Sequence, residues 1–271
     1  MTTVTTDNVG TLRLGGDLEV RRLGFGAMRL TGDGIWGEPA DREECRRVLR
    51  RALELGINLI DTADSYGPEV SENLIAETLH PYPDDLVIAT KGGLVRPGPN
   101  QWDADGRPEH LREACEGSLR RLKVDRIDLY QLHRPDPNVP YEESLGAIKE
   151  LQDEGKIRLA GVSNVDLDQL ATAQSVFDVV SVQNRYNLAD RSSEDVLQQC
   201  EQESIAFIPW APLDAGNSEV PNEIALAWLL QRSPAMLPIP GTSSVEHLEQ
   251  NVEAADIDAE TLAEALSRIE G

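Results

Sequence analysis

Four side chains of types that transfer protons follow short apolar segments of the chain. Asp61 and Tyr66 come after a segment with apolar residues at 57, 59 and 60, Lys91 ends a second segment, and His133 ends a third. A tyrosine is a weak acid at neutral pH, because its ordinary pKa is about 10. A lysine ammonium beside the phenol would lower that pKa, and a carboxylate would keep the lysine charged. The four residues predict a site that protonates an oxygen gaining negative charge, with a neutral His133 orienting that oxygen.

A carbonyl oxygen gains such charge when hydride reaches its carbon. No side chain can donate hydride, so this chemistry requires a cofactor. Later segments end in residues that could bind one. Asn164 and Gln183 could hydrogen-bond a carboxamide, and Trp210 could cover a nicotinamide ring. The Gly/Thr/Ser-rich helix start at 241–244 could hold phosphate through its backbone N–H groups.

These residues need elements that bring the ends of distant segments together. After residue 20, apolar segments alternate with segments of helical period, such as 41–56, 107–123 and 139–155. Parallel strands buried on both faces are typically this apolar. Eight such units predict an α/β fold, a closed (β/α)8 TIM barrel rather than an open doubly wound sheet, with its chemistry at the C-terminal strand ends. The expected strands are 23–28, 57–62, 86–91, 127–133, 157–164, 179–184, 205–211 and 236–241.

Two glycine-containing stretches lie near the N-terminus, and only the first predicts a specific structure. Residues 11–23 contain two alternating runs around Gly15-Gly16-Asp17, which predicts a β-hairpin that caps the bottom of the barrel. The GFG at 24–26 is not a dinucleotide fingerprint, because the third glycine of that motif would fall on Arg29. A nicotinamide cofactor would therefore bind outside a Rossmann fold. We expect one domain over residues 1–271.

The composition limits the possible partners. The 271 residues carry a formal net charge of −23, and such a field repels nucleic acid. Only four lysines are present, so arginine supplies most of the positive charge. Acid-rich, lysine-poor surfaces are typical of halophilic proteins that stay soluble in concentrated salt, and a GC-rich genome would also favour arginine. Both explanations stay open.

The chain has no signal for a membrane or for export. No apolar run approaches the length of about 18 residues that a spanning helix needs, and the N-terminus lacks a basic start and an apolar centre. The cysteines Cys45, Cys115 and Cys200 are odd in number and scattered, and the four histidines are spread out. We therefore expect a reduced, cytoplasmic protein without a metal site. The sequence does not fix the oligomeric state and is compatible with a monomer.

Eight segments of the chain resemble, in family order, those of the aldo-keto reductases. They cover nearly the whole chain, so the resemblance is specific. The family folds as a (β/α)8 barrel, and its members mostly reduce aldehydes and ketones with NADPH. The matching segments are LGFGAM (23–28), LIDTADSYG (59–67), ATKGG (89–93), DLYQLHRPD (128–136), GVSN (161–164), VQNRYN (182–187), IPWAPL (208–213) and IPGTSSVEHLEQN (239–251).

The resemblance implies a role for each matching residue. Tyr66 would be the general acid, Lys91 and Asp61 its partners, and His133 the residue that orients the carbonyl. The substrate pocket would be lined by Met28, Trp36, Tyr66, Trp102 and His133. The cofactor would be held by Ala27, Met28, Ser163, Asn164, Gln183, Trp210, Ala211, Leu213, Gly241, Thr242, Ser243, Ser244, His247, Gln250 and Asn251, with the carboxamide at 163, 164 and 183 and the adenosine end at 241–251.

Two departures from the family pattern affect the cofactor. Many members have lysine in place of Gly241 and arginine in place of His247, near the 2′-phosphate that distinguishes NADPH from NADH. NADPH stays the expected cofactor, with NADH as the alternative. The segment 214–221 is shorter than in relatives, which predicts a more open cofactor site with faster exchange.

Three functions are consistent with these observations to different degrees. The main hypothesis is reduction of small carbonyl compounds, and the phrases at 61–86 and 225–234 resemble a bacterial branch that includes pyridoxal reductases. The alternative is a cofactor-binding, redox-sensing or regulatory subunit with little turnover, since some family members act through a partner. A metal-dependent barrel hydrolase is disfavoured because no H-x-H is present.

Overall fold

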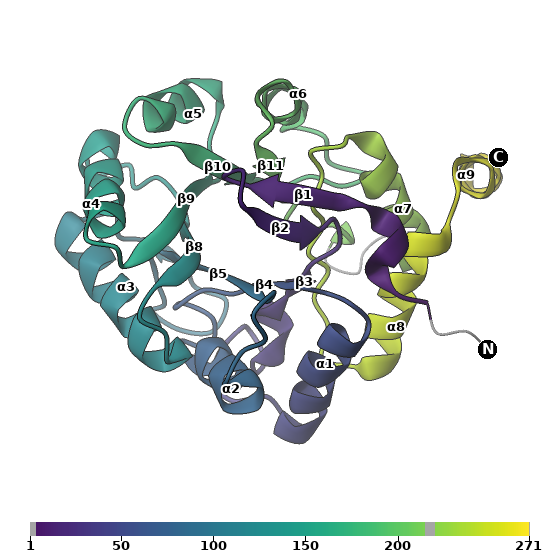
Figure 1. The fold of residues 1–271 in the computed structure, drawn as a ribbon, viewed down its shortest axis with the longest axis horizontal. Coiled ribbons are helices and arrows are strands. Elements are labelled where there is room, and N and C mark those ends of the chain that lie inside the picture. The colour runs from purple at the N-terminus through teal and green to yellow at the C-terminus, as the bar shows by residue number, and fades with distance from the viewer. Residues whose placement is uncertain (1–3, 215–219, 271) are drawn as a thin grey trace.

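The computed structural model describes residues 4–214 and 220–270. Its centre is a parallel sheet in the order β11-β10-β9-β8-β5-β4-β3, and helices surround this sheet in a ring (Figure 1). The order shows that each successive β/α unit adds a strand beside the preceding one. The strands are β3 (Phe25–Gly26), β4 (Leu59–Asp61), β5 (Val87–Gly92), β8 (Ile127–Leu132), β9 (Ile157–Ser163), β10 (Val179–Gln183) and β11 (Ala206–Phe207).

The segment 236–241 closes the barrel between β11 and β3. The N–H groups of Gly24 and Gly26 donate to the carbonyls of Pro238 at 2.9 Å and Pro240 at 3.1 Å. The sequence predicts a strand here, but the segment joins β11 only through an isolated bridge. Pro238 and Pro240 have no N–H group, so they cannot complete a regular ladder. The expected barrel is confirmed, and the expectation of a regular eighth strand is wrong.

The helices begin where the sequence provides start signals. The carboxylate of Asp41 accepts the N–H of Glu44 at 2.8 Å and caps α1, whereas α3 begins with a proline in its first turn. The last helix, α9, lies outside the ring (Figure 1). The bounds are α1 (Arg42–Glu54), α2 (Val70–Leu79), α3 (Pro108–Leu122), α4 (Tyr141–Asp153), α5 (Leu167–Gln174), α6 (Glu194–Glu203), α7 (Asn222–Arg232), α8 (Val245–Glu253) and α9 (Ala259–Glu270), with short 3-10 helices η1 (Thr6–Val9), η2 (Ala27–Leu30) and η4 (Ala254–Asp256).

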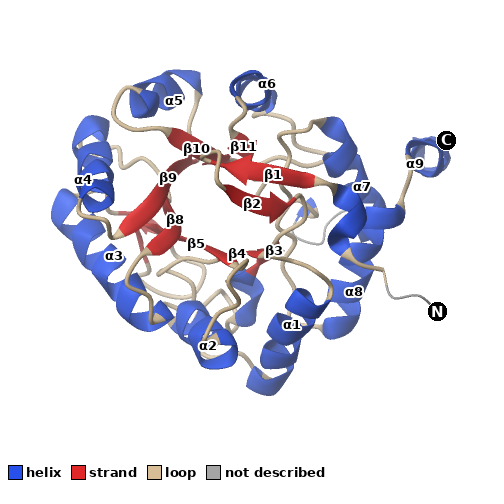
Figure 2. Ribbon diagram, viewed as in Figure 1, coloured by secondary structure: helices blue, strands red, loops and turns tan. Residues whose placement is uncertain are grey.

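The predicted N-terminal hairpin is present and lies across one end of the barrel (Figure 2). Strands β1 (Thr11–Leu14) and β2 (Leu18–Arg21) pair antiparallel. Leu14 and Val20 are buried in the same apolar cluster as Leu59 and Leu129 from the barrel strands. The hairpin therefore fills the barrel interior from the end opposite the C-terminal strand ends. A second small hairpin, β6 (Leu94–Val95) and β7 (Asp103–Ala104), follows β5.

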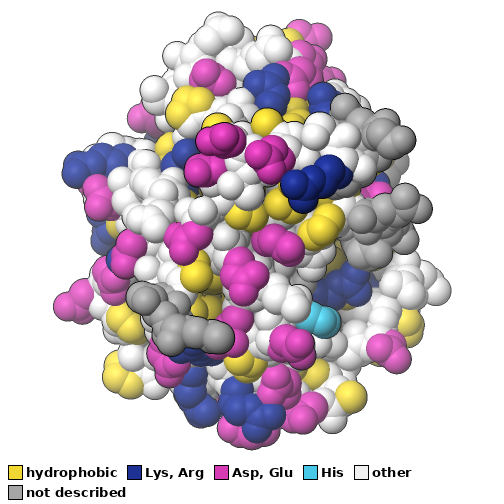
Figure 3. Space-filling model, turned by 90° about the vertical axis from the view of Figure 1, so that its right-hand side faces the viewer, with side chains coloured by type: hydrophobic (Ala, Val, Ile, Leu, Met, Phe, Trp, Pro, Cys, Tyr) yellow, Lys and Arg dark blue, Asp and Glu magenta, His cyan; other side chains and the backbone are white. Residues whose placement is uncertain are grey.

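The surface reflects the acidic composition. Aspartate and glutamate side chains are spread across the face shown in Figure 3, with basic side chains in smaller groups between them. Most of the ion pairs among the described residues involve arginine, and several pair residues three or four positions apart on one helix. Among the helices that the structure describes, none is long and apolar enough to cross a membrane.

Candidate active site

Alternation along the barrel strands explains how the predicted residues come together. In a barrel, residues i and i+2 of a strand point to the same side. Leu59 and Leu129 lie in the apolar cluster inside the barrel. Asp61 and Gln131 come two residues later and form the next layer, nearer the C-terminal strand ends. The interior thus changes from apolar to polar within one step of each strand.

Lys91 is the centre of this polar layer. Its side chain is fully buried and its ammonium donates to Asp61 at 2.6 Å and to the Thr62 carbonyl at 2.8 Å. The other oxygen of Asp61 accepts amide hydrogens from Gln183 at 2.9 Å and Gln131 at 3.3 Å. Burial disfavours an isolated charge, but a paired and hydrogen-bonded one is tolerated. Burial lowers the pKa of the Lys91 ammonium, and Asp61 and Tyr66 outweigh this, so that its pKa lies above the ordinary value.

Tyr66 lies next to this ion pair, and its acidity differs from the prediction. Its ring centroid is 5.2 Å from the Lys91 ammonium, and only 7% of the residue is exposed. Burial raises the pKa of the Tyr66 phenol, Lys91 opposes this, and the carboxylate of Asp61 adds to the rise. The net pKa therefore lies above 10, not below it as the sequence predicts. The lysine limits the rise that burial causes.

His133 faces the same space and stays neutral, as the sequence predicts. Its ring centroid is 5.9 Å from that of Tyr66, and the two rings are nearly perpendicular. Burial lowers the pKa of His133 well below its ordinary value, and the positive charges of Lys91, Arg134 and Arg96 lower it further. The Nδ1 atom is buried and has no hydrogen-bond partner among the described residues. A neutral imidazole can donate one N–H group to a substrate oxygen.

The residues expected to hold a carboxamide form a connected cluster. Ser163 donates to the carbonyl of Gln183 at 2.6 Å, and the amide of Asn164 donates to the His133 carbonyl at 2.9 Å. The oxygen of that amide accepts the Trp210 indole N–H at 3.0 Å. Asn164 has the left-handed backbone angle φ of 59°, which asparagine tolerates better than most residues. These contacts fix the orientation of Asn164 and Trp210 at the rim.

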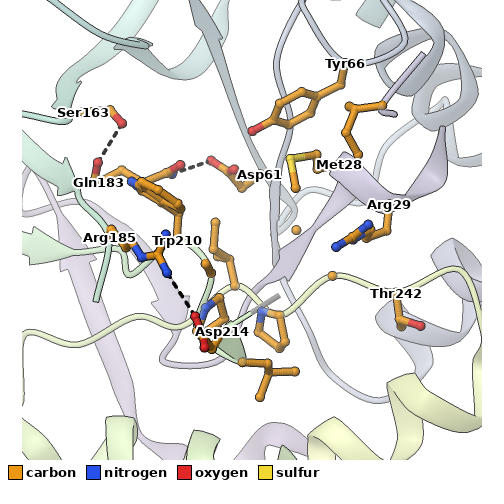
Figure 4. A pocket seen from close by; sticks show the side chains of 18 of the residues that line it. Met28, Arg29, Asp61, Tyr66, Ser163, Gln183, Arg185, Trp210, Asp214 and Thr242 are labelled. Atoms are coloured by element: carbon orange, nitrogen blue, oxygen red, sulfur yellow. Dashed lines mark hydrogen bonds and ion pairs between the residues drawn. The ribbon is translucent and has the colours of Figure 1, made fainter. Parts of the chain in front are cut away.

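One pocket of about 810 Å³ contains most of the predicted site (Figure 4). Asp61, Tyr66 and His133 lie at its inner end, and buried Lys91 lies behind them. The predicted cofactor and substrate residues that line it are Met28, Trp102, Ser163, Asn164, Gln183, Trp210, Ala211, Leu213, Gly241, Thr242, His247 and Asn251. Those that do not line it are Ala27, Trp36, Ser243, Ser244 and Gln250. The roles assigned to all of these residues stay predictions.

Trp36 is absent from the lining, and its side chain is turned to the surface although its neighbours Gly34 and Ile35 line the pocket. The residue is 37% exposed, and its backbone forms a bridge with Gly67. Trp102 instead lies in the pocket, with its ring 6.3 Å from that of Tyr66 and 6.5 Å from that of His133. The prediction of a substrate-pocket wall therefore fits Trp102, whereas the lining excludes Trp36.

Arg96 holds the loops around Tyr66 together, and the sequence analysis missed it. Its guanidinium donates to the carbonyls of Ile35 at 2.7 Å, Ser65 at 3.0 Å and Gln101 at 2.7 Å, which lie on three different loops. It also stacks 3.6 Å from the ring centroid of Trp102. The side chain thus ties the substrate-pocket walls to the residue before Tyr66. No motif in the sequence marks this role, because it depends on loops meeting in space.

Three backbone N–H groups around the start of α8 already have side-chain acceptors. The N–H of Val245 donates to a Glu44 carboxylate oxygen at 3.0 Å, and the N–H of His247 donates to the Ser244 hydroxyl at 3.4 Å. The bond from Val245 is the main reason why the pKa of Glu44 lies below its ordinary value. The N–H of Ser244 donates to the Thr242 hydroxyl at 3.1 Å. Of the N–H groups at 241–244 that the sequence analysis assigns to phosphate, that of Ser244 therefore already has an acceptor, whereas Val245 and His247 lie beyond that range.

The comparisons with known proteins identify the family. The model of the aldo/keto reductase family matches residues 22–219 and 215–270. The chain belongs to this family. This membership makes it an NAD(P)H-dependent oxidoreductase, and it confirms the resemblance and the barrel fold.

Relatives of this aldo/keto reductase cover nearly its whole length. It is 54% identical over 269 residues to an uncharacterized oxidoreductase of Schizosaccharomyces pombe, which covers 94% of this chain and 87% of the relative. It is 40% identical over 277 residues to pyridoxine 4-dehydrogenase of Escherichia coli, and the match covers 94% of this chain and 96% of the relative. An aldo-keto reductase from Klebsiella pneumoniae, solved in complex with NADPH, aligns with a TM-score of 0.77 and 30% identity over 96% and 94% of the two chains.

The pocket of this aldo/keto reductase has groups that suit a dinucleotide. The side-chain oxygen of Asn251 lines the pocket, is buried, and has no partner among the described residues, so it can accept a ligand N–H such as that of an adenine amine. Trp210 offers an aromatic face at the opposite end. The segment 215–219, on which the expectation of an open site depends, lies outside the described residues. Among the described residues, no group of three or more His, Cys, Asp or Glu side chains could hold a metal.

Proposed function

We propose that this protein reduces aldehydes or ketones to alcohols with NADPH. One observation carries the proposal. A fully buried lysine, paired with a buried carboxylate, lies beside a tyrosine whose ring faces a neutral histidine in one pocket. Such an arrangement can deliver a proton to an oxygen that gains negative charge, and a purely structural ion pair would need neither the tyrosine nor the pocket.

In this proposal Tyr66 donates the proton from its phenol oxygen to the carbonyl oxygen. The phenolate that remains is formed in a buried site, where a negative charge is costly. The Lys91 ammonium stabilises that phenolate, and Asp61 keeps the ammonium charged and in place. Gln131 and Gln183 hold the carboxylate with their amides, so that the pair does not reorganise during proton transfer.

His133 positions the substrate. Its ring stays neutral because burial and three nearby cations oppose a further positive charge. A neutral ring donates one hydrogen bond without protonating the substrate, so the proton comes from Tyr66. Trp102 and Met28 supply apolar contacts at the same end of the pocket. This arrangement favours a small carbonyl compound with a flat or apolar body.

The bound dinucleotide would supply the hydride. Trp210 would cover the nicotinamide ring, Ser163 and Gln183 would hold its carboxamide, and Asn251 would face the adenine. We propose NADPH rather than NADH because the related protein from Klebsiella pneumoniae is solved with NADPH. The ratio of kcat/KM with the two dinucleotides tests this choice, and a preference for NADH would overturn it.

The first substrate to test is pyridoxal. The support is the 40% identity with pyridoxine 4-dehydrogenase of Escherichia coli. The assay is NADPH oxidation with pyridoxal, small aldehydes and sugars, in the unmodified protein and in Tyr66→Phe. We expect turnover with at least one carbonyl compound that Tyr66→Phe lacks. Cofactor binding without turnover on any carbonyl would favour the regulatory subunit instead.

The cytoplasm is the compartment we propose, because the three cysteines are buried and unpaired.

A further inference from the structure

Arg29 is a cation in the pocket to which neither the family resemblance nor the mechanism gives a role. It lies on η2, directly after β3, and lines the pocket. Figure 4 shows its guanidinium directed into the open centre of the pocket. Within the described part of the chain, this guanidinium makes no ion pair and no hydrogen bond. Arg29 is exposed at the pocket, so its charge is accessible to a ligand there.

The other cations of the pocket are occupied or lie elsewhere. Arg185 pairs with Asp190 at 2.9 Å and with Asp214 at 3.0 Å. Arg134 follows His133 directly and therefore belongs to the substrate end. The guanidinium of Arg29 is thus the positive charge available for a ligand near Gly241 and Thr242.

The geometry at Gly241 explains why the charge comes from another element. A Cβ atom at this position would lie 2.5 Å from the carbonyl oxygen of Gly26, so the tight pairing with β3 excludes any side chain. The Cγ atom of Arg29 would be the next side-chain neighbour, at 3.7 Å. A lysine cannot extend into the pocket from residue 241 without moving the backbone. Arg29 covers the same strip of the pocket from the facing element.

Two of the N–H groups at the start of α8 are already engaged. The Glu44 carboxylate accepts the Val245 N–H, and the Thr242 hydroxyl accepts the Ser244 N–H. A phosphate at this position would have to displace these acceptors and would be repelled by Glu44. The full positive charge of Arg29 is therefore the stronger anion-binding group at this end of the pocket.

We propose that Arg29 binds a phosphate group of the dinucleotide cofactor. This inference rests on the proposed function, since it requires that a dinucleotide occupies the pocket. A guanidinium can donate two parallel hydrogen bonds to a phosphate in a fork geometry that a lysine ammonium lacks. The phosphate is either in the diphosphate, which NADPH and NADH share, or the 2′-phosphate, which only NADPH carries.

The test is equilibrium binding of NADPH and of NADH, followed by quenching of protein fluorescence. The variants are Arg29→Gln and Arg29→Lys. The matched control is Arg126→Gln, which removes one positive charge from an exposed residue directly before β8, at the opposite end of the barrel. We expect Arg29→Gln to raise the Kd for NADPH at least about tenfold, equivalent to about 1.4 kcal/mol. The Kd of Arg29→Lys should lie between those of the unmodified protein and Arg29→Gln, because lysine keeps the positive charge but cannot donate two parallel hydrogen bonds. The control should bind as the unmodified protein does.

The outcomes separate the possible sources of the effect. Equal weakening of NADPH and NADH identifies the diphosphate, whereas weakening of NADPH alone identifies the 2′-phosphate. Both support the inference. If Arg29→Gln, folded by circular dichroism, binds both dinucleotides within twofold of the unmodified protein, the inference is wrong while the proposed function stands. If the unmodified protein binds neither dinucleotide, the proposed function itself has failed.

Discussion

Replacement of Lys91 by methionine should reduce stability and activity by separate mechanisms. The ammonium is fully buried and lies 2.6 Å from Asp61. Without it, the carboxylate keeps only the amide donors of Gln183 at 2.9 Å and Gln131 at 3.3 Å. Removal of one partner of a buried pair costs about 3–5 kcal/mol, because the remaining charge is left uncompensated. We therefore expect the free energy of unfolding of Lys91→Met to fall by about this amount.

The loss of activity has another cause. Burial raises the pKa of Tyr66, and the Lys91 ammonium opposes this rise. In Lys91→Met the phenolate loses its counterion, so proton donation becomes harder and the pKa rises further. Loss of a positioned acid typically lowers the rate by about 100- to 10,000-fold. We expect kcat/KM for the best carbonyl substrate to fall within this range.

The double variant Asp61→Asn/Lys91→Met separates the two effects. It removes both charges, so no uncompensated carboxylate remains, and the unfolding free energy should recover by at least half of the loss. Activity should not recover, since Tyr66 still lacks a cation. Urea unfolding and NADPH oxidation measure the two quantities on the same samples. If the double variant regained turnover within tenfold of the unmodified protein, the assignment of Lys91 to proton transfer would be refuted.

Three further changes test other parts of the site. Burial raises the pKa of Asp64 to about 8. The folded protein therefore holds a proton that the unfolded chain has released between about pH 4 and pH 8, and stability falls as pH rises through this window. Between about pH 5 and pH 8, the free energy of unfolding of Asp64→Asn, measured in urea, should fall by at least about 1 kcal/mol less than that of the unmodified protein. An equal dependence on pH in the two proteins would contradict this. Glu44→Gln keeps an acceptor for the N–H of Val245 and removes a negative charge, so the NADPH-to-NADH ratio of kcat/KM should rise severalfold; an unchanged ratio means that the 2′-phosphate lies away from α8. Arg96→Met leaves loop carbonyls without donors, so we expect a loss of about 3 kcal/mol and a raised KM for the carbonyl compound, with the KM for NADPH as the comparison.

The sequence predicts the barrel well because its signals are local. Apolar strand segments and helical periods recur along the chain, and Asp41 and Pro108 mark helix starts. The eighth strand is the exception, because Pro238 and Pro240 remove the N–H groups that a regular ladder needs. Residues 27–30 also differ, since the end of the first predicted strand forms the 3-10 helix η2. Both differences arise from backbone hydrogen bonding that hydrophobic periodicity does not report.

The sequence predicts the candidate site best where a residue lies at or just after the end of a strand. Asp61, Lys91 and His133 satisfy this condition, and Gln131 could have been found too, because it lies on β8, two residues before His133. Arg96 could not be found in this way, since its partners are backbone carbonyls on three loops. A carbonyl acceptor is available at every residue, so no sequence pattern records which loops meet.

The balance of charge in the pocket is the property that the sequence describes least well. The net charge of the sequence is strongly negative, and the electrostatic field of such a protein would weaken the binding of an anionic cofactor. The structure distributes the charge unevenly. Asp61 pairs with Lys91, and Asp190 and Asp214 share Arg185, whereas Arg29 lacks a carboxylate partner among the described residues. In our proposal, the way the charges are paired, rather than their number, leaves Arg29 available to bind a phosphate of the cofactor.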